Sequence, residues 1–161
     1  KSHAQPIVDV GPAELPVVYT IPAGGFDIIV NGDHVLSWGI EPHELQDAAM
    51  ANLTAWSAAA PWTDETSDDR RLGSSDTADG LVAVRILLQD VMAYLAATLA
   101  PGRIMVGIPE RHLLTAGALR AGDDEFAAMF AEFIVEHSGG ADEPIDRRVF
   151  ELVDGRLVEF A

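Results

Sequence analysis

The chain has 161 residues, of which 48% are hydrophobic, with 14 glycines, 9 prolines and no cysteine. This length and composition fit a single folded domain over residues 1–161 and exclude a disordered chain. The absence of cysteine excludes disulfides, a thiol nucleophile and cysteine-ligated metal sites.

The net charge is −16, from 26 acidic and 10 basic residues. Such a surface repels phosphate backbones and anionic lipids, so we expect no nucleic-acid partner. No apolar run is long enough to span a bilayer, and the first residues lack a signal-peptide core. We therefore expect a soluble protein with no membrane partner. We also expect no cofactor.

The first elements are predicted to be strands. Residues 15–21 are apolar and rich in β-forming side chains, which favours a strand. Asn31-Gly32 suits a two-residue turn, because both positions tolerate a positive φ. The sequence therefore predicts a hairpin between residues 26–30 and 33–37.

Two helices and a loop follow along the chain. Apolar residues recur at helical spacing over 42–56 and again over 86–99, where Pro101-Gly102 ends the pattern. Residues 61–80 between them are polar, acidic and rich in turn formers. We predict a long acidic surface loop there, with room for a short strand.

The second half of the chain is rich in hairpin signals. Residues 103–108 and 113–119 are apolar and are joined by a short connection, which favours a hairpin. A third helix is predicted over 122–137, because acidic residues at its start favour the positive end of the helix dipole. Residues 147–153 and 156–160 alternate around Asp-Gly, a strong hairpin signal. The order predicts an α+β fold, with a largely antiparallel sheet built from hairpins and three helices packed on it.

Four segments, which together lie within residues 15–133, resemble a known family. They are Leu15-Pro-Val-Val-Tyr19, the run from Trp38-Gly-Ile-Glu-Pro-His-Glu-Leu45 to Leu53, Ala83-Val-Arg-Ile-Leu-Leu88 and Val106-Gly-Ile-Pro-Glu-Arg-His-Leu-Leu114. In these segments the chain is similar to the YtpQ-like family of uncharacterised bacterial proteins. The resemblance implies a bacterial cytoplasmic α+β protein, and it brings no known activity and no catalytic residues.

The best candidate site lies in the connection at 109–112, where Glu110, Arg111 and His112 are consecutive. A glutamate and a histidine together can perform acid–base chemistry, and an arginine can hold a carboxylate or a phosphate. The alternative is an exposed hairpin turn in which Arg111 pairs with a local acid.

Two weaker candidates lie earlier in the chain. His43 and Asp47 are four residues apart on the first predicted helix, so they share a face and could contribute two ligands to a metal site. The alternative is a surface pair near a helix start. Trp38 is a candidate for an aromatic ligand platform, and the alternative is a core position.

None of these patterns specifies an activity, so three hypotheses remain. The favoured one is a non-catalytic interaction or regulatory protein whose acidic surface binds a basic protein partner. The second is a small metal-assisted or acid–base hydrolase that uses the turn at 110–112. The third is a structural homodimer that pairs through an exposed C-terminal strand at 156–160.

Overall fold

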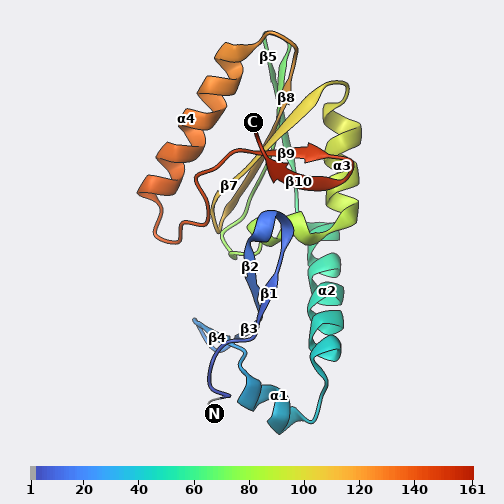
Figure 1. Cartoon of the computed structure of the whole chain (residues 1–161), viewed down its shortest axis with the longest axis vertical. Helices are drawn as coiled ribbons and strands as arrows, with labels where there is room; N and C mark the ends of the chain where they lie inside the picture. Colours follow the sequence, from blue (N-terminus) through green and yellow to red (C-terminus); the bar gives the residue numbers. More distant parts are fainter. Residues whose placement is uncertain (1–2) are drawn as a thin grey trace. The chain divides into compact units, whose positions relative to one another are not determined.

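The computed structural model describes residues 3–161, which combine α-helices with antiparallel sheets (Figure 1). The α+β prediction is confirmed. The chain forms two compact units, an N-terminal unit of residues 1–58 and a C-terminal unit of residues 59–161. Among the described residues, no helix is long and apolar enough to cross a bilayer.

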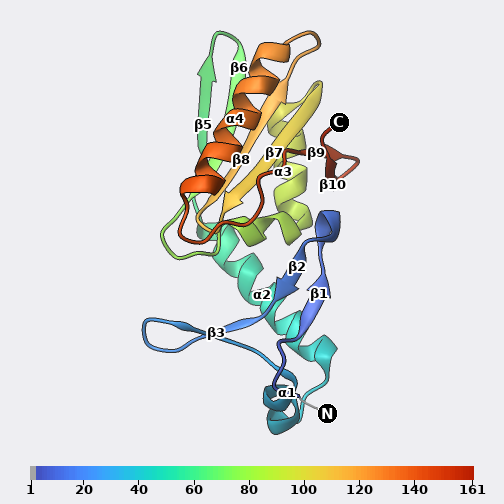
Figure 2. The ribbon, with the colours of Figure 1, turned by 60° about the vertical axis from the view of Figure 1, so that its left-hand side comes forward.

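The N-terminal unit consists of two small antiparallel sheets and two helices. One sheet pairs β1 with β2, the other pairs β3 with β4, and the β3–β4 turn projects from the rest of the unit (Figure 2). Its core contains Tyr19, Val30 and Val35, packed against partly buried apolar side chains. The elements are β1 (Val8–Val10), β2 (Pro16–Val18), β3 (Thr20–Pro22), β4 (Asp27–Ile29), α1 (Gly32–Trp38) and α2 (Pro42–Ala59).

The hairpin predicted around Asn31-Gly32 is wrong, because Asn31 caps helix α1 instead. The Asn31 side chain accepts a hydrogen bond from the His34 backbone N–H at 3.0 Å, and His34 Nδ1 accepts one from the Asn31 N–H at 3.0 Å. This reciprocal pair satisfies two backbone donors at the start of the helix. Asparagine favours both tight turns and helix caps, so its presence alone did not distinguish them.

The C-terminal unit is built on one antiparallel sheet with the strand order β10-β9-β7-β8-β6-β5. The hairpins predicted between residues 103 and 119 and at the C-terminal end are confirmed. The strands are β5 (Thr63–Ser67), β6 (Arg70–Asp76), β7 (Arg103–Glu110), β8 (Leu113–Leu119), β9 (Phe150–Val153) and β10 (Arg156–Glu159).

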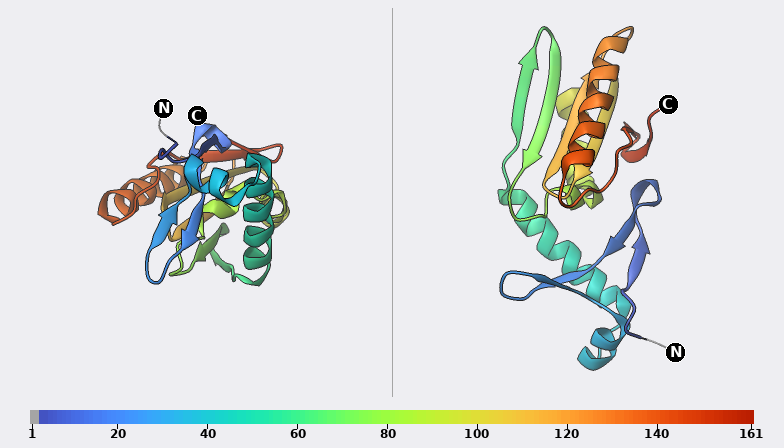
Figure 3. Two further views of the ribbon diagram at one scale, coloured as in Figure 1. Left: turned by 90° about the horizontal axis from the view of Figure 1, so that it is seen from below. Right: turned by 90° about the vertical axis from the view of Figure 1, so that its left-hand side faces the viewer.

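The polar segment 61–80 forms regular structure where a long loop was predicted. Strands β5 and β6 pair as a hairpin that forms one edge of the sheet (Figure 3). Asp68 and Asp69 make its turn with φ of 50° and 67°, a conformation that aspartate tolerates better than most residues. The β6 segment has a low β-propensity, yet it forms a strand because it pairs with β8 in the folded sheet. Tertiary context here overrides the local preference of the residues.

Helices cover both faces of this sheet (Figures 1 and 2). On one face Met105 and Leu119 form a core with Phe126, Phe130 and Ile134. Strand residues alternate between the faces, so the buried residues between these positions lie toward the other helical layer. The helical elements are the 3-10 turn Ala83–Leu87, α3 (Gln89–Leu99) and α4 (Asp124–Gly140).

Candidate functional site

The turn between β7 and β8 is held by Arg111, which contacts two other segments. Its Nε donates to the Gly80 carbonyl at 3.0 Å, and its Nη1 lies 2.9 Å from Oε1 of Glu143. The Arg111 backbone N–H also donates to the Glu143 carbonyl at 3.1 Å, and the Ala83 N–H donates to the Arg111 carbonyl at 3.3 Å. Arg111 therefore ties the turn to the segments before the 3-10 turn and after α4.

Gly80 makes this arrangement possible. Its φ of +77° suits glycine, and a Cβ there would lie 2.5 Å from Nε of Arg111. Any residue other than glycine at position 80 would therefore place its Cβ against the Arg111 guanidinium. From the sequence, neither Gly80 nor Glu143 was identified as a partner of the turn, because long-range pairing leaves no local signal.

The other two members of the turn have separate surroundings. His112 Nδ1 lies 3.3 Å from the Thr77 carbonyl oxygen, and its Nε2 lies 3.5 Å from Oε2 of Glu143. Glu110 instead lines an open depression of about 250 Å³ together with Glu136, His137 and Gly140. The histidine that lines this depression with Glu110 is therefore His137 of α4, which the sequence analysis missed because it is 27 residues away.

Trp38 belongs to the N-terminal unit, at the end of α1, and its side chain is 44% exposed. It stacks on His34, one turn earlier, with ring centroids 5.5 Å apart and planes 15° apart. The turn at 110–112, by contrast, belongs to the C-terminal unit. An exposed tryptophan on a histidine offers a flat apolar surface to a ligand.

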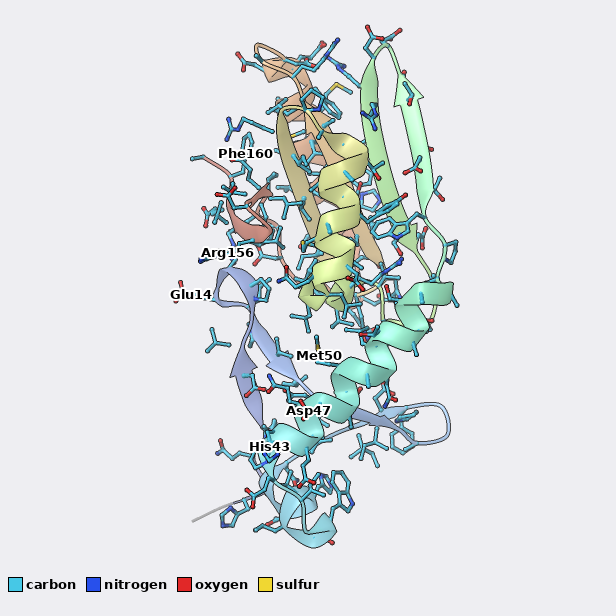
Figure 4. The ribbon with its side chains drawn as sticks, turned by 90° about the vertical axis from the view of Figure 1, so that its right-hand side faces the viewer. Glu14, His43, Asp47, Met50, Arg156 and Phe160 are labelled. Carbon is cyan, nitrogen blue, oxygen red and sulfur yellow. The ribbon has the colours of Figure 1, made fainter. Side chains whose placement is uncertain are left out.

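His43 and Asp47 lie on consecutive turns of α2, and both are exposed (Figure 4). Among residues 3–161, no group of three or more His, Cys, Asp or Glu side chains is placed to hold a metal ion. Zinc sites in proteins use three or four protein ligands. His43 and Asp47 therefore remain a candidate for two ligands of a metal site.

Arg85 is a buried charged residue that the sequence analysis did not identify. Its guanidinium lies 4.3 Å from the centre of the Trp62 ring, and Nη1 donates to Ser75 Oγ at 2.7 Å. Burial lowers the pKa of Arg85, since it disfavours the charged form. Trp62 also stacks on Tyr94, with ring centroids 5.3 Å apart. Arg85 thus links the segment before β5 to β6, and Trp62 links the same segment to α3.

Arginine is distributed unequally between the units. Residues 3–58 contain seven acidic residues and neither lysine nor arginine, whereas all nine arginines lie between Arg70 and Arg156. In the described part of the chain, ion pairs with acids of the same unit are made by Arg70, Arg103, Arg111, Arg120 and Arg148.

Comparison with known proteins gives no relative for this chain: no protein-family model, no curated protein and no solved structure matches it.

Proposed function

We propose that this protein is a non-catalytic interaction or regulatory protein that binds a basic polypeptide through an acidic surface. The observation that carries the proposal is the charge of the N-terminal unit, where residues 3–58 hold seven carboxylates and no lysine or arginine. A positively charged partner gains association rate and specificity from such a surface.

The acids of α2 are the most concentrated part of this surface. Glu41, Glu44 and Asp47 lie within seven residues at the start of the helix, and all three are exposed. The Glu44 carboxylate also accepts a hydrogen bond from the Glu41 N–H at 2.7 Å, which orders this end of the helix. Exposed carboxylates grouped at one helix start can pair with arginine and lysine side chains.

The turn at 110–112 supports a structural role more than a catalytic one. Arg111 is occupied by Gly80 and Glu143, and His112 is next to Thr77 and Glu143. These contacts leave the arginine already paired with an acid, as in the structural alternative for this turn, although that acid, Glu143, is 32 residues away.

The test is a titration with short peptides of defined charge. We expect the protein to bind the peptide Arg-Arg-Ser-Thr-Ser-Thr-Arg-Arg at low ionic strength, and to bind it more weakly as salt screens the charges. The same peptide with glutamate in place of arginine should not bind. Failure of the arginine peptide to bind at low salt would contradict the proposal.

Two triple variants with the same change in net charge test which unit binds the arginine peptide. The change Glu41→Gln/Glu44→Gln/Asp47→Asn should weaken binding of the arginine peptide by about tenfold or more, since three ion pairs of a few tenths to 1 kcal/mol are lost.

The control Glu132→Gln/Glu136→Gln/Asp142→Asn removes three exposed acids from the C-terminal unit, with the same change in net charge. We expect it to weaken binding much less. Equal effects of the two triple variants would show attraction by net charge alone and would remove the assignment to the N-terminal unit.

One observation favours a second function, a small acid–base or metal-assisted hydrolase. Glu110 and His137 line the same open depression, and a carboxylate beside an imidazole can transfer protons. If this function is correct, a hydrolytic activity found with model esters should be lost in Glu110→Gln and His137→Asn and retained in His112→Asn.

A further inference from the structure

The β1–β2 hairpin presents apolar side chains to solvent on one face. Its register pairs Val8 with Val18 and Val10 with Pro16, and such opposed residues lie on the same side of a sheet. Val8 is 54% exposed, Val10 82% and Val18 43%, and Pro16 is exposed as well. We call Val8, Val10, Pro16 and Val18 the β1–β2 apolar face.

The opposite face of the hairpin is the one turned toward the core of the unit. Asp9 lies between Val8 and Val10 and points to that side, where its carboxylate accepts a hydrogen bond from the Tyr19 hydroxyl. Tyr19 is itself a core residue. Burial, with the hydrogen bond to Asp9, raises the pKa of Tyr19 to about 12, so the phenol remains protonated and donates at neutral pH.

The face turned toward the core thus carries Asp9 and its cross-strand partner Val17, both half-buried, whereas Val8, Val10 and Val18 are exposed on the other face. A shift of one residue would exchange the two faces, and the Tyr19–Asp9 hydrogen bond opposes that shift. A two-stranded sheet is marginally stable in water unless another element packs on it. The apolar face is therefore a surface that gains stability when it is covered.

The negative charge of the chain favours a positively charged partner on this face. A second copy would bring together two chains of net charge −16 and two N-terminal units that have no lysine or arginine in residues 3–58. Anionic lipids and nucleic acids are repelled by the same charge. Glu14, which is exposed in the connection between β1 and β2, places a carboxylate at the tip of this hairpin (Figure 4).

We propose that the β1–β2 apolar face docks a segment of another protein in which apolar residues are flanked by arginine or lysine. This inference rests on the proposed function and names the surface and the partner chemistry for it. The apolar residues of the partner cover Val8, Val10 and Val18, and its basic flanks meet acids of the N-terminal unit.

The experiment compares two peptides of equal charge on the full chain. We expect Arg-Arg-Val-Ile-Val-Ile-Arg-Arg to bind about tenfold more tightly than Arg-Arg-Ser-Thr-Ser-Thr-Arg-Arg, because it buries additional apolar surface. The variant Val8→Thr/Val10→Thr keeps the β-branched shape and the charge at two exposed positions, and it should lose this preference.

The control is Val158→Thr, an exposed strand valine of the C-terminal unit, which should keep the full preference. The inference is overturned if the double variant still prefers the apolar peptide. It is also overturned if the wild-type protein binds both peptides equally, an outcome that leaves the proposed function standing. Absence of binding to either peptide would remove the proposed function, and the inference with it.

Two further outcomes would assign the face to another occupant. If a second copy covered the face, sedimentation velocity would show a dimer for the wild-type protein and a monomer for Val8→Thr/Val10→Thr. Flotation with phosphatidylcholine vesicles would carry wild type but not the double variant if a lipid surface covered it. We expect the wild-type protein to sediment as a monomer and not to float with the vesicles.

Discussion

Arg70 on β6 holds both carboxylate oxygens of Asp123, the residue that caps α4. The Nε–Oδ2 distance is 3.0 Å and the Nη2–Oδ1 distance is 2.8 Å, a two-point pairing with fixed geometry. The same carboxylate accepts the Phe126 backbone N–H at 3.3 Å, which satisfies a free donor at the helix start. One side chain therefore fixes the beginning of α4 and its position on the sheet.

We expect the two roles of Asp123 to separate by substitution. Asp123→Asn keeps an oxygen for the cap and loses the charged pair, so it should destabilise the protein less than Asp123→Ala, which loses both. Arg70→Gln should resemble Asp123→Asn. Midpoints of urea unfolding measure the order, and equal midpoints for Asn and Ala would show that the cap contributes nothing.

The protein should lose stability in acid, through carboxylates held by arginines. Hydrogen bonds from Arg70 keep the pKa of Asp123 below its usual 3.8, and those from Arg103 keep the pKa of Glu151 below its usual 4.5, in both cases against the opposing effect of burial. A depressed folded-state pKa contributes stability above the unfolded pKa, and this is lost as pH falls through the folded one.

We therefore expect the unfolding free energy to fall as pH decreases below about 4.5, with the Glu151 contribution lost first along this limb. Urea unfolding at a series of pH values measures it. In Arg103→Gln the slope should become shallower, because Glu151 then titrates nearer to its unfolded value. An unchanged slope in this variant would exclude the Arg103–Glu151 pair as a source of acid sensitivity.

Gly107 of β7 is required because α4 packs directly on it. A Cβ at this position would lie 2.1 Å from Cδ1 of Ile134 and 2.8 Å from its Cγ1. Ile134 is fully buried, so it has little room to move. We expect Gly107→Ala to cost about 1–3 kcal/mol of unfolding free energy, measured by urea denaturation.

Two further variants test whether the contact with Ile134 causes the expected loss in Gly107→Ala. Gly139→Ala, in a helical position with no atom near the added Cβ, should be neutral or stabilising by up to about 1 kcal/mol. Ile134→Val removes the Cδ1 atom that clashes, so Gly107→Ala should cost less in that background. If the cost is the same with valine, the contact with α4 is not its origin.

Gly80 and Arg111 should be coupled in the same way. Gly80→Ala places a methyl group 2.5 Å from Nε of Arg111 and also strains a φ of +77°, so we expect a loss of about 2–4 kcal/mol. Gly122→Ala has a similar φ of +81° with nothing near its Cβ, and it should cost only the strain, about 1 kcal/mol.

A double-mutant cycle with Arg111→Ala completes this test. Removing the guanidinium relieves the contact, so Gly80→Ala should then cost about as much as Gly122→Ala. Strict additivity of Gly80→Ala and Arg111→Ala in urea unfolding would mean that the two residues act independently, and the turn would then be held by its backbone hydrogen bonds.

The sequence predicted the fold best where local signals and packing agree. The hairpins at 103–119 and at the C-terminal end combine apolar strands with short turns, and the long helices combine apolar spacing with clear ends. It failed at Asn31, where one residue type serves two local structures. It also failed at 61–80, where β6 forms a strand because β8 supplies its hydrogen bonds.

The candidate site was less predictable than the fold. Glu110 and His112, two residues apart, suggested one acid–base pair, yet Glu110 lines a depression with His137, and His112 lies beside Glu143. The exposure of Val8 and Val10 was also not predictable, because alternation in a strand says which residues share a face and not which face is buried. In the structure the buried side is the one where Tyr19 donates to Asp9.

The unequal distribution of arginine also determines how the protein can be dissected chemically. Trypsin cleaves after lysine and arginine, and from residue 3 the first such residue is Arg70 at the start of β6. Any complete tryptic digest therefore keeps residues 3–58 together with β5 in one long peptide, whatever the conformation. A partner crosslinked anywhere on the N-terminal unit would be recovered on that single peptide, whereas arginine-directed reagents would mark only residues from Arg70 onward.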